Sequence, residues 1–127
     1  MRVRLEYRPE PFHSPVSHWT HKAPPKKLFW RTQRNELTPP MPRPIPGKGY
    51  PVWVLENRGR EIFFASPEEI AHVVDVLDRR VLPRTIDLAR PTSLNSHWLS
   101  RLHKSWKPWR VRQKMVAALA PYARPKS

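Results

Sequence analysis

Cysteine is absent from the 127 residues of the chain, and only three glycines are present. The absence of cysteine excludes disulfide bonds and thiolate metal sites. Residues 1–7 lack the apolar segment of a secretory signal. No apolar run approaches the roughly 18 residues that a membrane-spanning helix requires. We therefore expect a cytoplasmic protein that has no membrane partner.

Acidic residues are also scarce, because ten acids stand against 24 lysines and arginines, which gives a formal net charge of +14. The excess of positive charge lies in the N-terminal and C-terminal parts of the chain. Residues 1–50 carry ten cations and three acids, residues 51–94 carry six and seven, and residues 95–127 carry eight and none. A neutral centre between two basic arms indicates a partner of opposite charge, most often a nucleic acid.

The length of the chain predicts one small domain that extends over residues 1–127. Its apolar share of 39% indicates a modest core. We divide the domain into a basic, proline-rich strand and strap (1–50), a hairpin–helix scaffold (51–94) and a basic helical segment with a frayed tail (95–127).

Three stretches have the pattern of β-strands. Residues 52–56 and 60–65 are rich in β-branched and aromatic side chains, and Asn57-Arg58-Gly59 between them predicts a hairpin turn. Residues 2–8 alternate apolar and polar side chains, which predicts a third antiparallel strand beside the hairpin.

A capped amphipathic helix follows the hairpin. Ser66-Pro67-Glu68-Glu69 has the pattern of a capping box, with Ser66 as the N-cap and Glu69 reaching back to the Ser66 amide. An apolar stripe then recurs at helical spacing, which predicts a helix over 67–81. The stripe consists of Ile70, Val73, Val74, Leu77 and Val81.

The segment from residue 9 to residue 51 holds eleven of the 17 prolines, which predicts extended or polyproline-type backbone. Large aromatic residues interrupt it, so we expect an ordered strap across the core, with Trp19 and Phe29/Trp30 as anchors. The alternative is an arm that becomes ordered only on its partner.

The C-terminal segment predicts two further helices, at about 95–103 and 108–120. The sequence thus predicts an α+β fold. A small antiparallel sheet of about three strands is packed by the capped helix, with two C-terminal helices and a Pro/aromatic-rich extended N-terminal strap.

Basic residues alternate with three tryptophans between residues 97 and 110. Proteins that bind single-stranded nucleic acid combine cations, which contact phosphates, with aromatic rings, which stack on bases. A helix-turn-helix that offers Arg110, Gln113 and Lys114 to the major groove is an alternative. The residues predicted to bind nucleic acid are Lys26, Lys27, Arg31, Arg101, Lys104, Trp106, Lys107, Arg110, Arg112 and Lys114, with Lys22 and Arg34 as further cations of the strap.

Arg112 falls inside the apolar arc of the last predicted helix. The simpler explanation is a side chain that reaches solvent or pairs with an acid such as Asp75, Asp78 or Asp87. The other explanation is a guanidinium held at the edge of a groove for a phosphate or a carboxylate.

Metal binding and catalysis have weak support. His13, His18 and His21, with Glu10 nearby, lie in proline-rich backbone, whereas a zinc site without cysteine needs a rigid scaffold and supporting carboxylates. The acids of the predicted helix fit capping and solvated positions rather than a catalytic pair. We therefore expect no metal, no cofactor and no catalytic residues.

The sequence favours a non-enzymatic nucleic-acid-binding protein that mainly contacts phosphates, with DNA and RNA both open. The alternative is a small inhibitor or accessory factor of a nucleoprotein complex, of phage or mobile-element type, that docks on an acidic protein surface. Residues 95–102, with residues 107–110, bear a general resemblance to small basic proteins of bacterial mobile elements. This resemblance implies no role for any residue.

Overall fold

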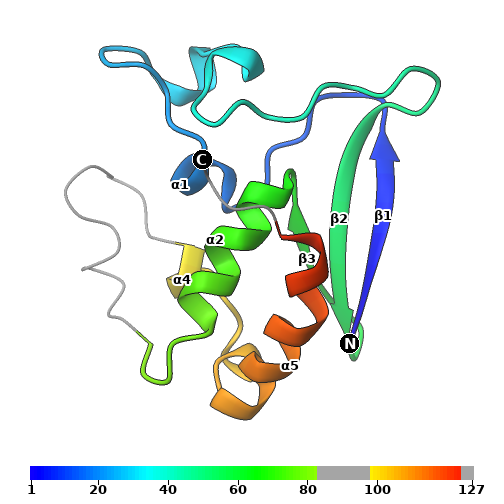
Figure 1. The fold of residues 1–127 in the computed structure, drawn as a ribbon, viewed down its shortest axis with the longest axis vertical. Helices are drawn as coiled ribbons and strands as arrows, with labels where there is room; N and C mark the ends of the chain where they lie inside the picture. Colours follow the sequence, from blue (N-terminus) through cyan, green and yellow to red (C-terminus); the bar gives the residue numbers. More distant parts are fainter. Residues whose placement is uncertain (83–97, 124–127) are drawn as a thin grey trace.

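The computed structural model describes residues 1–82 and 98–123, apart from the side chains of Ser100 and Arg101. Strands β1 (Arg2–Arg8), β2 (Tyr50–Asn57) and β3 (Arg60–Phe64) form an antiparallel sheet in the order β1-β2-β3. The two main helices, α2 (Pro67–Leu77) and α5 (Trp109–Leu119), cover one face of this sheet (Figure 1). The predicted α+β architecture is confirmed at this level.

The hairpin turns at Arg58 and Gly59, whose φ angles are 52° and 80°. Two successive residues with positive φ make a type I′ turn, which matches the twist of the flanking strands. The register pairs Leu55 with Ile62 on one side and with Val3 on the other, so these three side chains share the face that the helices cover. The predicted hairpin and the third strand are both confirmed.

Helix α2 begins as predicted but ends early. Ser66 Oγ accepts a hydrogen bond from the amide of Glu69 at 3.2 Å. The carboxylate of Glu69, however, accepts from the Ala65 amide at 3.0 Å rather than from Ser66, so this half of the capping box was wrong. The helix ends at Leu77 instead of Val81, and Val81 is 81% exposed. It can end there because Arg112, from α5, binds the carbonyl groups that follow.

The main core lies between the sheet and the helices. Residues of α2 and α5 meet there, and Trp98, Leu99 and Trp106 join them from the segment between the two helices. The buried apolar residues of this core are Val16, Trp19, Leu55, Phe64, Ile70, Val73, Val76, Leu77, Trp98, Leu99, Trp106, Met115 and Leu119.

The segment between β1 and β2, which we call the strap (residues 9–49), is less extended than predicted. It contains helix α1 (Ser17–Thr20) and two 3-10 turns, η1 (Phe29–Arg31) and η2 (Arg34–Glu36). Isolated bridges join Lys22 to Thr38 and Ile45 to Gly49. Proline prevents long helices and ladders, but single helical turns fit between the prolines.

Two of the three residues predicted to anchor the strap pack on a core, and the third does not. Trp19 is 8% exposed and packs in the main core, as expected. Phe29 packs on a second, smaller core of Leu37, Met41 and Ala65, whereas Trp30 is 70% exposed. The prediction of Trp30 as an anchor was wrong, because in a 3-10 turn neighbouring side chains point to different sides.

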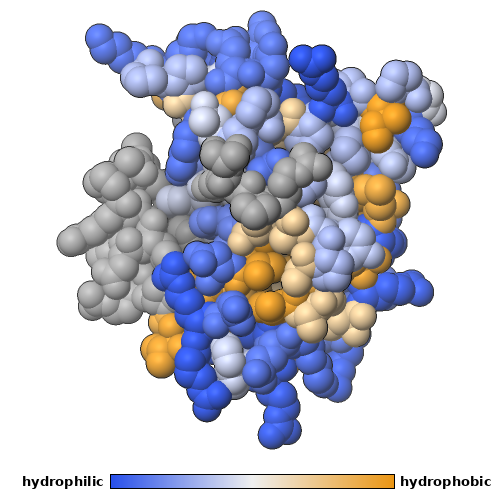
Figure 2. Space-filling model, viewed as in Figure 1, coloured by the Kyte–Doolittle hydropathy of each residue, from blue (hydrophilic) through white to orange (hydrophobic). Residues whose placement is uncertain are grey.

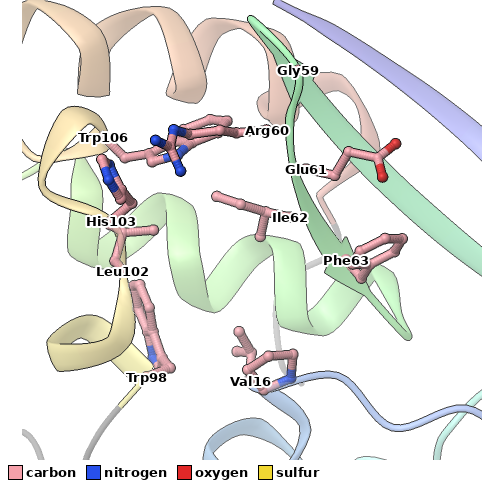
Figure 3. A pocket seen from close by; sticks show the side chains of 11 residues that line it. Val16, Gly59, Arg60, Glu61, Ile62, Phe63, Trp98, Leu102, His103 and Trp106 are labelled. Atoms are coloured by element: carbon pink, nitrogen blue, oxygen red, sulfur yellow. The ribbon is translucent and has the colours of Figure 1, made fainter.

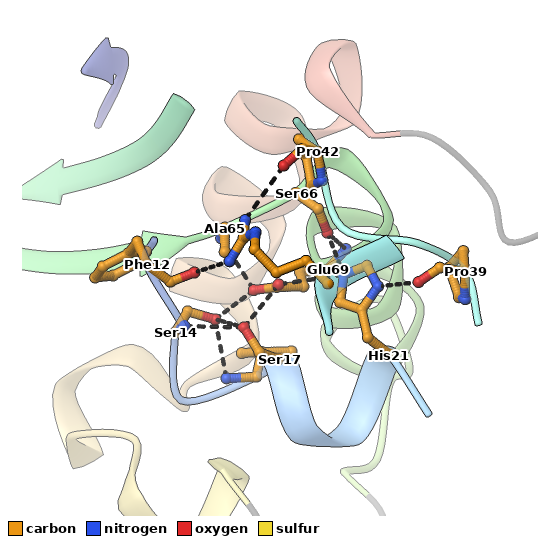
Figure 4. Close-up of polar contacts among 11 residues, drawn as sticks. Phe12, Ser14, Ser17, His21, Pro39, Pro42, Ala65, Ser66 and Glu69 are labelled. Atoms are coloured by element: carbon orange, nitrogen blue, oxygen red, sulfur yellow. Dashed lines mark hydrogen bonds and ion pairs between the residues drawn. The ribbon is translucent and has the colours of Figure 1, made fainter. Parts of the chain in front are cut away.

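A buried polar cluster fixes the strap to the start of α2 (Figure 4). The carboxylate of Glu69 accepts hydrogen bonds from the hydroxyl groups of Ser14 and Ser17, and His21 Nε2 lies 3.3 Å from it. Ser17, His21 and Glu69 are fully buried. Buried polar groups must find partners, so the strap and the helix cap complete each other.

The C-terminal segment contains α4 (Trp98–Arg101), the 3-10 turn η3 (Lys104–Trp106), α5 and the 3-10 turn η4 (Ala120–Tyr122). The start of the predicted helix at 95–97 and the tail at 124–127 lie outside the described residues. Pro108 is the N-cap of α5 rather than its first helical residue. None of the helices in the described ranges is both long and apolar enough to span a bilayer.

Candidate nucleic-acid interface

Arg112 connects the end of α2 to the start of α5. Its guanidinium donates hydrogen bonds to the carbonyl oxygens of Leu77 (3.2 Å), Arg79 and Arg80 (3.1 Å), and Nε donates to that of Lys107 (2.7 Å). The last carbonyl groups of a helix lack partners within it, and a cation there also complements the helix dipole. Arg112 therefore caps α2.

The burial of Arg112 has an electrostatic cost. The residue is 4% exposed, and burial lowers the pKa of its guanidinium, with a further contribution from the charge of Arg80. The predicted aspartate partners are not the groups that hold it: Arg112 binds backbone carbonyls, and Asp87 lies outside the described residues. Because its donors are already engaged, Arg112 positions the surface rather than contacting a ligand.

Trp109 stands between two arginines. The guanidinium carbon of Arg80 lies 5.2 Å from the centre of the Trp109 ring, and that of Arg112 lies 5.0 Å from it. Both distances are within the range of a cation–π interaction. The half-buried ring thus holds Arg80, which is exposed, at the surface.

The clamp made by Arg112 gathers cations from two parts of the chain. Arg79 and Arg80 follow α2, and Lys107 and Arg110 flank the start of α5. Lys114 lies one helical turn beyond Arg110, on the same side of α5. Among these cations Arg79 has an acidic partner, Asp75, at 3.1 Å, while residues 98–123 contain no acid at all. We call Arg79, Arg80, Lys104, Lys107, Arg110 and Lys114 the basic end.

The first turn of α5 adds backbone donors to the basic end. No side chain caps this turn and no acid lies in it, whereas α2 has Ser66 as its cap and two acids in its first turn. The free amide groups at a helix N-terminus favour anions. This arrangement supports an anion-binding role for the neighbouring cations.

The predicted cations of the strap lie elsewhere. The strap occupies the end of the molecule opposite η3 and the start of α5 (Figure 1), and hydrophilic side chains gather at both ends in the same view (Figure 2). Lys26 and Arg31 are exposed there, and Lys27 pairs with Glu36 at 2.7 Å. The fold therefore separates the predicted binding residues into two groups.

Arg34 of the strap has a structural role. It donates to the carbonyl oxygens of Phe12 (3.0 Å) and Pro42 (3.4 Å), and its guanidinium lies 5.0 Å from the centre of the Tyr50 ring. Burial lowers the pKa of this guanidinium. Arg34 thus fixes the strap to β2 rather than facing solvent.

One predicted residue of the C-terminal segment is buried, and the side chain of another is not described. Trp106 is 3% exposed and packs in the main core, so its ring is not open to a base. Arg101 lies in α4, but its side chain is outside the part of the chain that the structure describes.

The buried cluster of Ser66, His21 and Glu69 resembles a catalytic triad in composition but not in geometry. Ser66 Oγ lies 2.7 Å from His21 Nε2, and the Glu69 carboxylate lies near the same nitrogen. In a triad the acid holds Nδ1 instead. Here Nδ1 lies 2.6 Å from the carbonyl oxygen of Pro39, and all three side chains are fully buried. We interpret the cluster as a structural lock.

Among the described residues, no group of three or more histidines and acids is placed to hold a metal ion. Comparison with known proteins found no matching family, no similar curated protein and no similar solved structure. The interpretation of the basic end therefore depends on its geometry and charge.

Sequence reasoning missed Arg79 and Arg80. The two arginines were placed within a helix that extended to Val81. The sequence signal was the Arg-Arg pair directly after the last buried residue of the helix, Leu77. Basic residues are typical of a helix end, where they complement the dipole.

Proposed function

We propose that the protein binds nucleic acid at the basic end, without catalysing a reaction. The observation that carries this proposal is the clamp of Arg112, which holds the backbone of Arg79 and Arg80 beside that of Lys107. Concentrated cations with one acidic partner among them attract phosphates.

The mode of binding follows from the hydrogen-bond donors at the basic end. Lysine and arginine side chains and the backbone amides of the first turn of α5 suit phosphate oxygens, which fix position without reading sequence. Trp109 is occupied by Arg80 and Arg112, so it organises cations rather than stacking on a base. We therefore expect salt-sensitive and largely non-specific binding.

The test is fluorescence anisotropy with single-stranded and duplex DNA and RNA of about 20 nucleotides, between about 50 and 300 mM salt. The triple variant Arg80→Gln, Lys107→Gln, Arg110→Gln should reduce the slope of log affinity against log salt by about one for each lost phosphate contact. The matched control, Lys26→Gln, Arg31→Gln, Arg43→Gln, removes the same charge from the strap and should retain most of the slope.

Two results would contradict the proposal. The absence of binding at the lowest salt would exclude nucleic acid as the partner. An equal loss in both triple variants would show that net charge, and not the basic end, determines binding.

Val81 favours a second candidate function, the docking of an acidic protein surface. It is 81% exposed directly after Arg79 and Arg80, and an exposed apolar group next to cations is typical of protein interfaces. The charged oxygens of a phosphate backbone do not form a favourable contact with the apolar side chain of Val81. Val81→Ser should therefore weaken binding to a protein partner and leave nucleic-acid binding unchanged.

A further inference from the structure

A groove of about 460 Å³ separates β3 from the segment that contains α4 and η3 (Figure 3). Its walls are apolar: Trp98 and Leu102 lie opposite Ile62, and Val16 closes one end. Arg60, His103 and Trp106 lie at the other end (Figure 3). This groove adjoins the basic end at η3, where His103 and Trp106 flank Lys104, but neither the buried lock nor the proposed function uses it.

The backbone of β3 forms one side of the groove, and β3 is an edge strand of the sheet. The two-residue turn makes Asn57 and Arg60 a hydrogen-bonded pair, and such pairs alternate along an antiparallel ladder. Ile62 therefore exchanges hydrogen bonds with Leu55. The amide and carbonyl groups of Glu61 and Phe63 point away from β2, toward the free edge.

The side chains of Glu61 and Phe63 leave this edge clear. Both point away from the groove (Figure 3). Glu61 forms an ion pair with Arg4 on the far face of the sheet, and the Phe63 ring packs against Phe12 with 6.2 Å between the ring centres. At these two positions β3 presents its backbone to the groove, in the alternating pattern of donors and acceptors that another strand would match.

We propose that this groove binds an extended peptide of a partner protein, which adds a fourth strand to the sheet beside β3. This mode of recognition takes affinity from main-chain hydrogen bonds and specificity from pockets for alternate side chains. The half-buried Ile62 and Leu102 suit an apolar side chain of the peptide, and the buried Trp98 and Trp106 support this wall from the core side.

The charges that line the groove favour an acidic peptide over a basic one. The charged or titratable side chains that point into the groove are Arg60 and His103, while the carboxylate of Glu61 is paired with Arg4. A carboxylate of the peptide placed beside Arg60 would complete a charge-assisted hydrogen bond. A nucleic acid fits less well, because the carbonyl groups of Glu61 and Phe63 are acceptors and would face phosphate oxygens.

The test selects ligands from a displayed library of random peptides of about eight residues, with the full chain as bait. We expect enrichment of peptides that alternate apolar residues and include an acid. Glu61→Pro removes the outward amide without breaking the ladder to β2 and should weaken the selected peptides about tenfold. Glu61→Ala, which loses the same ion pair but keeps the amide, is the matched control and should bind like the wild type.

Arg60→Glu provides an independent variant at the exposed first residue of β3, where a substitution removes no buried contact. With this variant as bait, the enriched peptides should carry a basic residue instead of an acid. The proposal is overturned if no peptide is enriched over the Glu61→Pro bait, if Glu61→Pro and Glu61→Ala bind the peptides equally, or if Glu61→Pro loses nucleic-acid binding instead. These outcomes are independent of the test of the basic end.

Discussion

The guanidinium of Arg112, in α5, donates a hydrogen bond to the carbonyl oxygen of Leu77, the last residue of α2, at 3.2 Å. Together with its bonds to the next carbonyl groups, this contact ends α2 and fixes the position of the basic end. Stability and binding should therefore both depend on a residue that is itself buried.

Arg112→Met keeps the apolar contacts of the side chain and removes its donors. Because one buried and three part-buried carbonyl groups then lose their donor, we expect the free energy of unfolding to fall by about 2–4 kcal/mol. Urea denaturation measures this change. Arg110→Met, on the exposed side of the same helix, should change stability by less than about 0.5 kcal/mol. Equal effects of the two substitutions would show that Arg112 is not a clamp.

Glu69 should be a second essential buried group. Glu69→Ala leaves the hydroxyl groups of Ser14 and Ser17 and the amide of Ala65 without their acceptor, so we expect a loss of about 3 kcal/mol or more. Amide exchange of residues 14–21 should accelerate, because the strap loses its attachment. Asp75→Ala, which removes an exposed ion pair of the same helix, is the control and should cost less than about 1 kcal/mol. Unchanged exchange in the strap would contradict the role of the cluster.

Gly49 and Gly47 offer a matched pair of substitutions. Both have positive φ angles, 108° and 79°, but a Cβ at Gly49 would collide with the backbone carbonyl group of Arg8, whereas a Cβ at Gly47 would meet nothing within 4 Å. Gly47→Ala should cost about 1–2 kcal/mol from the backbone alone. Gly49→Ala should cost at least about 1 kcal/mol more, since β1 must move. Thermal unfolding measures both, and equal costs would contradict the predicted collision.

The pH dependence of stability should reflect His13 and His18, whose rings pack edge-to-face on Phe29 at 5.5 Å each. Burial lowers the pKa of both imidazoles in the folded state, with smaller contributions from Arg34 at His13 and Lys22 at His18. The unfolded chain then binds more protons at acidic pH. Above the unfolded-state pKa of about 6.5 both histidines are neutral, and the free energy of unfolding has its full value. As the pH falls from there through the lowered folded-state pKa, the free energy of unfolding decreases, because the unfolded chain takes up protons more readily than the folded one.

Urea midpoints measured between about pH 7.5 and 5 test this expectation. The double variant His13→Gln, His18→Gln should show a flatter decrease on the acid side than the wild type. If the two profiles are parallel, these histidines do not control the acid sensitivity of the strap.

Trp30 should affect neither folding nor nucleic-acid binding. Because its side chain is 70% exposed, Trp30→Ala should leave the free energy of unfolding within about 0.5 kcal/mol of the wild type. The strap that carries Trp30 lies at the end of the molecule opposite the start of α5 (Figure 1), so the affinities for single strands and for duplex should also be retained. Anisotropy with both forms measures them. A selective loss of single-strand affinity would show that Trp30 stacks on a base and that the strap takes part in binding.

Local signals in the sequence determined the strands and the beginning of α2. Arg58-Gly59 can adopt the positive φ angles of a type I′ turn. The alternation of residues 2–8 fixes which side chains share one face of the strand. Ser66 caps the helix by accepting a hydrogen bond from the amide of Glu69, three residues later. Each of these features depends on residues that are close in the sequence, so the pattern is sufficient to find them.

Tertiary contacts decided the end of α2, the path of the strap and the surface that carries the charge. Arg112 stops α2 from a distance of 35 residues, and Glu69 holds serines that lie more than 50 residues before it. The tertiary structure also placed Trp106 in the core and Trp30 in solvent. Whether a side chain is buried, and whether its hydrogen-bonding groups find partners, depends on the whole fold. Composition alone therefore cannot tell which of several tryptophans is buried or which of several arginines is held by hydrogen bonds.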